Sequence, residues 1–254
     1  MSGEVIATTA GRVARIALAR PEKKNALTGE MYAQLAAALL AAGRDPQVRV
    51  VLLHGSRECF TAGNDISDFL KRAPGESSPV FGLFQVLPAL EKPVVAAVAG
   101  PAVGIGTTLL LHCDLVFAAA DARLQLPFVP LGIVPEFGST LLLPRLSGYQ
   151  RAAKLLLLGQ PFTAQEAFEA GIVTEVVSKE TLFEKAEAAA AMLAALPPES
   201  LKLTKRLMKQ GTAKELEARI AEEGRMFIER LASPEAKEAM SAFLEKRKAD
   251  FSRF

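Results

Sequence analysis

The sequence contains few of the residues that build metal centres, disulfide frameworks or nucleophilic triads. Its 254 residues include two cysteines, Cys59 and Cys113, and two histidines, His54 and His112. Two cysteines are too few for a disulfide framework, and these side chains lack the spacing of a zinc site. His54 closes an apolar strand and His112 lies in an apolar helix, so both are interpreted as structural. We therefore expect no metal centre, and a reducing cytoplasmic setting.

Long apolar runs and an excess of one charge are also absent. Glu91, Lys92 and Pro93 interrupt the most apolar stretch, which stays below membrane-spanning length. The N-terminus alternates like a pair of strands and lacks the continuous apolar core of a signal peptide. Thirty basic and 28 acidic residues nearly cancel, so no strong global field attracts nucleic acid or a membrane surface. The sequence predicts neither partner, and any anionic ligand must be held by local groups.

Three short runs of apolar residues are typical of buried parallel strands. They lie at 50–53, 94–98 and 115–119, and their continuous hydrophobicity indicates a sheet covered on both faces. Helical periodicity separates them, beginning with a helix that Thr28 caps and Gly43 ends. Strands that alternate with helices predict an α/β fold.

The chain changes character near Leu196. Residues 197–254 are rich in Lys, Glu, Ala and Leu and have no strand pattern, which predicts a helical region after an α/β core at residues 1–196. The apolar positions of this region, including Met226, Phe227, Leu231 and Phe243, must cover either the core of this chain or a neighbouring subunit.

Two glycine-containing loops each follow a buried strand and lead into a helix, at 60–65 (FTAGND) and 100–106 (GPAVGIG). Backbone N–H groups at a helix N-terminus lack internal partners and sit at the positive end of the helix dipole. Two such ends that converge would form an oxyanion hole, whereas either loop taken alone is better explained by glycines that permit a tight turn. Neither loop has the spacing of a dinucleotide fingerprint.

Glu136 is the candidate for acid–base chemistry. It lies at a loop-to-helix junction among apolar residues, where burial would raise its pKa and make it a general base. The alternative is an acidic residue that complements a helix dipole.

Together these segments resemble the crotonase (enoyl-CoA hydratase/isomerase) superfamily, in order over nearly the whole chain. RPEKKNALT is similar to the family's RPxxxNAL opening, and FTAGND to its F-x-AG-x-D loop. KPVVAAVAGPAVGIG is similar to its KPxxAAxxGxAxGxG segment, and MSAFLEKRKADF to the ending of hydratases. The resemblance implies a spiral of strand-strand-helix units with two nearly perpendicular sheets, and a C-terminal helical region that forms trimers or dimers of trimers.

The resemblance also assigns roles to residues. Thioester oxygen would be held by the backbone N–H groups of Asn64 and Ile105, and Asp65 would cap the following helix. Coenzyme A, as part of the substrate and with no redox or metal cofactor, would be bound by Lys23, Lys24 and Ala62, and from a neighbouring subunit by Phe243 and Lys246. The region 69–88 would form one wall of the acyl pocket, with a mobile loop at 71–78.

The sequence departs from the family's hydratases at both of their catalytic glutamates, where Thr108 and Phe128 stand. Glu136 instead occupies the position of the single glutamate of peroxisomal-type 3-enoyl-CoA isomerases. The resemblance thus implies isomerisation of 3-enoyl-CoA to trans-2-enoyl-CoA, in which Glu136 moves a proton from C2 to C4. The site would be kept dry by Phe128, Val129, Leu131 and Phe137. The alternatives are a hydratase or hydrolase that uses Glu136, or an acyl-CoA binder without turnover.

Overall fold

The computed structural model describes residues 4–65, 67 and 78–254 of the chain. Its strands form two sheets. The larger sheet contains β1 (Glu4–Ala10), β2 (Val13–Ala19), β3 (Val50–His54), β4 (Val94–Val98), β6 (Leu115–Ala119) and β9 (Glu175–Val177), and the smaller contains β5 (Pro101–Val103), β7 (Arg123–Gln125) and β8 (Phe162–Thr163).

The larger sheet is parallel apart from its first strand. Strands β1 and β2 form an antiparallel hairpin. Gly11 and Arg12 form its two-residue turn with φ of 59° and 66°, a turn conformation whose twist matches that of the two strands. Strands β2, β3, β4, β6 and β9 then follow side by side in parallel. The three apolar runs predicted as buried parallel strands are confirmed, with β3 one residue longer.

The chain alternates between the two sheets. Strand β4 lies in the large sheet and is followed by β5 in the small one and by helix α4 (Ile105–Thr108); β6 and β7 repeat this order. After β3, Thr61 bridges to Ala102 in β5 and so takes the place of a second strand. Each turn of the spiral therefore brings the loop after a large-sheet strand to the edge of the small sheet.

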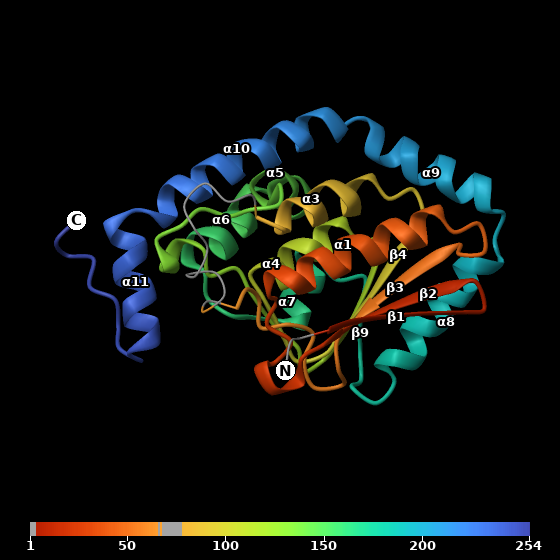
Figure 1. Cartoon of the computed structure of the whole chain (residues 1–254), viewed down its shortest axis with the longest axis horizontal. Coiled ribbons are helices and arrows are strands. Elements are labelled where there is room, and N and C mark those ends of the chain that lie inside the picture. The colour runs from red at the N-terminus through yellow and green to blue at the C-terminus, as the bar shows by residue number, and fades with distance from the viewer. Residues whose placement is uncertain (1–3, 66, 68–77) are drawn as a thin grey trace.

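Helices cover both faces of the large sheet (Figure 1). Ile16, Leu53 and Ala96 point to the side of α1 (Gly29–Arg44) and α3 (Val80–Ala89). Residues Leu52 and Val95 point to α8 (Leu182–Ala195). Successive side chains of a strand alternate between faces, so wholly apolar strands supply both cores. Thr28 caps α1 by accepting from the Met31 N–H at 3.2 Å, as predicted, and α1 ends one residue beyond Gly43.

The other helical segments before β9 connect the strands along the chain. The helix expected after the second glycine loop begins at Ile105 and continues from Leu109 to His112 as a 3₁₀ turn. Further 3₁₀ turns span Pro21–Lys23 and Val129–Leu131, and helices α5 (Ser139–Ser147), α6 (Tyr149–Leu158) and α7 (Ala164–Glu169) precede β9.

The C-terminal region is helical, as predicted, and contains α9 (Pro198–Gln210), α10 (Ala213–Leu231) and α11 (Pro234–Leu244). Helices α9 and α10 run along one side of the molecule and α11 stands at its end (Figure 1). Pro198 and Pro234 occupy first helical positions, where a missing N–H costs nothing. Among the described residues, no helix combines the length and apolarity that crossing a membrane requires.

Candidate active site

The two glycine loops predicted to form an oxyanion hole pack directly against each other. Thr61 donates its N–H to Pro101 O at 3.0 Å and accepts from the Val103 N–H at 3.1 Å. A Cβ atom at Gly63 would lie 2.7 Å from Val103 O, and one at Gly106 would lie 2.5 Å from Thr61 Cγ2. Glycine at 63 and 106 therefore permits an approach between the loops that no side chain would allow.

Both predicted donors are available in this arrangement. Ile105 is the first residue of α4, so its N–H has no acceptor within the helix. The hydrogen bonds of the Leu27–Asn64 bridge involve Gly63 O and the Asp65 N–H, so the Asn64 N–H takes no part in the bridge. Neither N–H has an acceptor within the described part of the chain. Gly104, with φ of 56°, has open space where a side chain would stand.

A buried network around Asn25 holds the first loop. The Asn25 amide donates to Cys59 O at 2.9 Å and Phe60 O at 3.1 Å, and accepts from the Arg20 N–H at 2.8 Å. Thr61 Oγ1 donates to Asn25 O at 2.7 Å and accepts from the Gly63 N–H at 3.0 Å. The asparagine of the NAL segment thus fixes the loop that presents the Asn64 N–H.

Side chains of the first loop are also anchored. Asn64 Oδ1 accepts a hydrogen bond from the Tyr32 hydroxyl, which α1 supplies. Asp65 forms an ion pair with Arg20 at 2.6 Å and accepts from the Ser67 N–H at 3.0 Å. The bond to Ser67 agrees with the predicted capping role of Asp65.

Glu136 is a buried carboxyl group, with 5% of its surface exposed. Thr108 donates its hydroxyl to Glu136 Oε1 at 3.2 Å. Burial raises the pKa of Glu136 to about 8, the Thr108 hydrogen bond opposes this rise, and the negative charge of Glu223 adds to it. Because Ile105 and Thr108 share one short helix, Glu136 lies next to the second glycine loop.

The backbone after Glu136 adopts an uncommon conformation. Phe137 and Gly138 have φ of 59° and 73°, and a bulky residue is rarely left-handed. The Phe137 ring is fully buried and stacks between Phe84, at 4.2 Å, and His112, at 3.9 Å. His112 Nε2 donates to Phe137 O at 2.8 Å, and burial lowers the pKa of His112 to about 3. His112 is therefore neutral and holds the Phe137 carbonyl group, which agrees with its interpretation as a structural residue.

Glu223 of α10 was not predicted from the sequence. It is 4% exposed, and its carboxylate accepts from the Gly138 N–H at 2.5 Å, the Thr140 N–H at 3.0 Å and the Thr140 hydroxyl at 2.5 Å. It caps helix α5, whose own N-cap residue has no side chain. In the segment IAEEGRMF (220–227), Glu223 resembles the exposed glutamate before it, and only the adjacent Gly224 indicates that this helix face lies close to another element.

The predicted coenzyme A residues at the N-terminal side lie together. Lys23 and Lys24 are exposed in and after the 3₁₀ turn, and Lys24 O accepts from the Ala62 N–H at 2.9 Å. The structure thus places both lysines beside the first glycine loop, with their side chains facing solvent.

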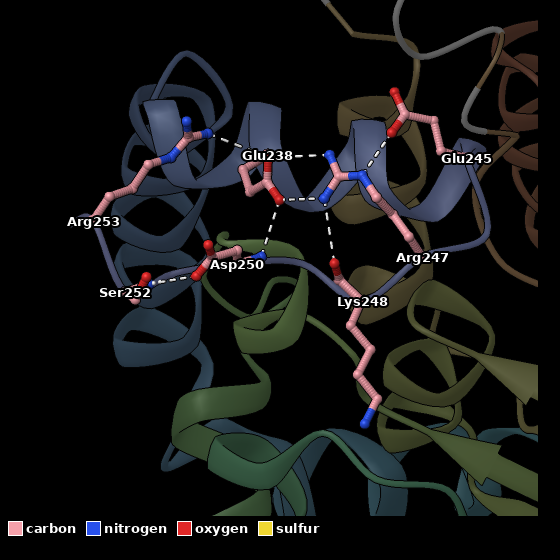
Figure 2. Close-up of polar contacts among 7 residues, drawn as sticks. All are labelled: Glu238, Glu245, Arg247, Lys248, Asp250, Ser252 and Arg253. Atoms are coloured by element: carbon pink, nitrogen blue, oxygen red, sulfur yellow. Dashed lines mark hydrogen bonds and ion pairs between the residues drawn. The ribbon is translucent and has the colours of Figure 1, made fainter.

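Phe243 and Lys246 lie apart from those lysines, at the end of α11, and Phe243 is 59% exposed. Their segment is held by Glu238, which accepts from Arg247 Nη1 at 2.5 Å, the Asp250 N–H at 2.9 Å and Arg253 Nη2 at 3.3 Å (Figure 2). These bonds, led by Arg247, hold the pKa of Glu238 well below its usual range.

Of the four residues expected to keep the site dry, Phe128 and Phe137 are buried and Leu131 is half-buried. Val129 is 43% exposed, because it begins a 3₁₀ turn at the surface. Of the predicted pocket wall, α3 includes 80–88, 78 and 79 precede it, and 69–77 lie outside the described residues.

Among the residues that the structure describes, no group of three His, Cys, Asp or Glu side chains could hold a metal ion. A cavity of about 420 Å³ lies between the C-terminal ends of α1 and α3. It is lined by residues such as Leu40, Arg44 and Val86. Val86 belongs to the predicted pocket wall, but none of the predicted catalytic, oxyanion or coenzyme A residues lines this cavity.

Comparison with known proteins agrees with this geometry. Residues 8–253 match the family described as "Enoyl-CoA hydratase/isomerase". The chain is 38% identical over 251 residues to the 1,2-epoxyphenylacetyl-CoA isomerase of Escherichia coli K12, covering 94% of this chain and 95% of that protein. It is 35% identical over 252 residues to the 2,3-dehydroadipyl-CoA hydratase of the same organism, covering 98% of both.

A solved structure extends the agreement to the fold. The crystal structure of an enoyl-CoA hydratase/isomerase from Pseudoalteromonas atlantica T6c matches with a TM-score of 0.93 and 41% identity, over 97% of this chain and 99% of that one. The predicted crotonase fold is confirmed. The chain belongs to the enoyl-CoA hydratase/isomerase family of enzymes.

Proposed function

We propose that the protein isomerises 3-enoyl-CoA thioesters to trans-2-enoyl-CoA, with Glu136 as its single acid–base group. The observation that carries this proposal is a buried Glu136 that is hydrogen-bonded to Thr108. Thr108 and the buried Phe128 stand at the two positions where, by the family resemblance, hydratases hold and activate water with glutamates. A threonine hydroxyl and a phenyl ring cannot deprotonate water, whereas one carboxyl group suffices for moving a proton along an acyl chain.

The proposed reaction begins with the removal of a proton from C2 by the Glu136 carboxylate. Electrons of the C2–H bond move toward the thioester carbonyl and form a dienolate, whose oxygen accepts from the Asn64 and Ile105 N–H groups. A preorganised donor of this kind contributes roughly 3 kcal/mol to transition-state stabilisation. The protonated Glu136 then delivers the proton to C4, and the double bond moves from C3–C4 to C2–C3.

The basicity of Glu136 suits this role. A general base works best when its pKa lies near the operating pH, and burial raises that of Glu136 to about 8. Exclusion of water by Phe128 and Phe137 protects the dienolate and strengthens the hydrogen bonds to its oxygen.

Coenzyme A enters this proposal as part of the substrate, with no metal or redox cofactor. Lys23 and Lys24 would meet its phosphates and Ala62 its adenine, while Phe243 and Lys246 would reach the coenzyme A of a neighbouring subunit in a trimer or dimer of trimers. The exposure of Phe243 and of Leu244, both 59%, supports a partner at this end of α11. The domain division at residue 196 and the cytoplasmic location remain predictions.

The relatives include proteins named as hydratases and as isomerases, so the reaction needs a direct test. The purified protein is incubated with 3-hexenoyl-CoA and, separately, with crotonyl-CoA, and formation of 2-hexenoyl-CoA and 3-hydroxybutyryl-CoA is followed. We expect isomerisation that Glu136→Gln lowers by roughly 10²- to 10⁴-fold.

The control is Glu229→Gln, which removes an exposed carboxylate of α10 that is paired with Arg225 at the surface. Hydration of crotonyl-CoA that survives Glu136→Gln would contradict the proposal and favour another carboxylate. Tight coenzyme A binding without any turnover that depends on Glu136 would favour the binder.

A further inference from the structure

We propose that Glu223 is a positioning residue for Glu136, holding the 136–138 turn and placing a second negative charge beside the Glu136 carboxyl. This inference rests on the proposed function, since it assigns Glu223 a part in the same site. Two features of the described chain carry it, namely the contacts of the Glu223 side chain and the strain of the turn that it binds.

The first feature is the set of donors around Glu223. Both carboxylate oxygens are used, Oε2 by the Gly138 N–H and Oε1 by the Thr140 N–H and hydroxyl. These donors lie two and four residues after Glu136, on the turn that carries it and at the start of α5. A buried carboxylate that accepts three hydrogen bonds fixes the backbone to which it binds.

The second feature is that the turn needs external support. Phe137 has φ of 59°, a conformation that costs a residue with a bulky side chain on the order of 1–3 kcal/mol. Stacking on Phe84 and His112 fixes the Phe137 ring, and Glu223 fixes the next N–H along the chain. Gly138 has no side chain that could cap α5, so the cap must come from another element.

The charges around the pair are few. Glu136 faces the Thr108 hydroxyl of α4 and the negative charge of Glu223. Burial raises the pKa of Glu223, and the hydrogen bonds from Thr140 and Gly138 oppose this rise and favour its charged form. The positive charge of Arg219, which donates to the Thr140 hydroxyl at 3.1 Å, acts in the same direction as these bonds. His112 lies against Phe137 in its neutral form. Glu223 is therefore the negative charge that acts on Glu136, and its removal should make Glu136 a weaker base.

Glu223→Gln tests this role, because glutamine keeps the size and one acceptor oxygen but has no charge. We expect the pH midpoint of kcat/KM for 3-hexenoyl-CoA to move to lower pH. We also expect kcat to fall by roughly 10- to 100-fold, because a shift of the base by about 1 Å is costly. KM should stay within about twofold, since Glu223 makes no contact that binds coenzyme A. Glu229→Gln is the matched control on the same helix.

A second readout needs no turnover and thus separates this inference from the proposed reaction. The free energy of unfolding is compared between proteins with and without Glu136→Gln, from pH 5 to 9. A buried carboxyl whose pKa is raised loses stability as pH increases up to that pKa. The free energy of unfolding of Glu136→Gln should therefore exceed that of the protein with Glu136 by an amount that grows with pH and levels off near pH 8. In the Glu223→Gln background this difference should level off at a lower pH.

The outcomes are distinct. An unchanged Glu136 midpoint in Glu223→Gln, with kcat as in the unmodified protein and only thermal stability reduced, would overturn the proposal and leave Glu223 a structural cap. Should Glu223→Gln fail to fold, Glu223→Asp keeps the charge and shortens the side chain. We then expect a midpoint that remains raised with a lowered kcat; a kcat equal to that of the unmodified protein would overturn the positioning role.

Discussion

The two halves of the candidate site are built in different ways. The two glycine loops, which we propose form the oxyanion hole, would act through backbone N–H groups, and their shape follows from glycines and from bonds between the loops, as between Thr61 and Val103. The proposed acid–base half would use one side chain, Glu136, which lies on a turn bound by Glu223, a residue 85 positions beyond Gly138. The backbone half therefore tolerates changes of side chain but not of glycine, whereas the Glu136 half responds to every group that touches the carboxyl.

The largest expected effect sharpens the backbone half of this comparison. Gly63→Ala places a Cβ 2.7 Å from Val103 O, at φ of 91°, and should displace the Asn64 N–H from the dienolate oxygen. Isomerisation should fall by roughly 10²- to 10³-fold, as for the loss of an oxyanion donor. Steady-state kinetics measures this loss, with Gly11→Ala as the control, because Gly11 is also left-handed, with φ of 59°, but meets no atom within 4 Å.

The pH dependence of the free energy of unfolding tests the Glu136 half of the site. Glu136 has its pKa raised from 4.5 to about 8 by burial. Between these values, the unmodified protein should lose up to about 1.4 kcal/mol per pH unit relative to Glu136→Gln. Chemical denaturation at pH 5, 6, 7 and 8 gives the difference, and equal slopes for the two proteins would show that Glu136 titrates as an exposed carboxyl.

A smaller effect is expected from the Thr108 hydroxyl. It donates to Glu136 Oε1 at 3.2 Å and lowers the pKa of that carboxyl, so Thr108→Val should raise the pKa further and move the midpoint of kcat/KM to higher pH. At pH 7 the rate should fall by about tenfold or less. Thr108→Ser keeps the hydroxyl and should behave as the unmodified protein does; a shift of the same size in Thr108→Ser would show that loss of the hydroxyl is not the cause.

The smallest effect is expected from Asn64→Ala. This substitution removes the bond between Asn64 and the Tyr32 hydroxyl but leaves the Asn64 N–H in place. Because that N–H is the proposed donor, kcat should change by no more than roughly threefold. A loss comparable with that of Gly63→Ala would mean that the Asn64 side chain, and not the loop backbone, supports the reaction.

The same contrast explains how much of the fold and of the candidate site could be predicted from the sequence. Apolar strands such as 94–98, the Thr28 cap and the glycine loops depend on local sequence, and the structure confirms them. Glu136 could be proposed because it is a carboxyl at a loop-to-helix junction in apolar surroundings. The contact between the two loops, and hence their joint role, followed only from the family resemblance.

What sequence reasoning missed depends on long-range contacts. The same helix carries other glutamates that are exposed, and only its burial distinguishes Glu223 from them. The left-handed conformation of Phe137 could not be predicted from the sequence either, because phenylalanine is not typical of that conformation. It depends on the packing of the Phe137 ring against Phe84 and His112.

The central claim is that one carboxyl group both removes and returns the proton, and isotope transfer tests it most directly. 3-Hexenoyl-CoA carrying deuterium at C2 is converted in ordinary water, and the early 2-hexenoyl-CoA product is analysed by mass spectrometry and NMR. The account predicts deuterium at C4, because the buried Glu136 retains part of the label between the two transfers. Product with only hydrogen at C4, even in the first turnover, would contradict it and require a separate proton donor.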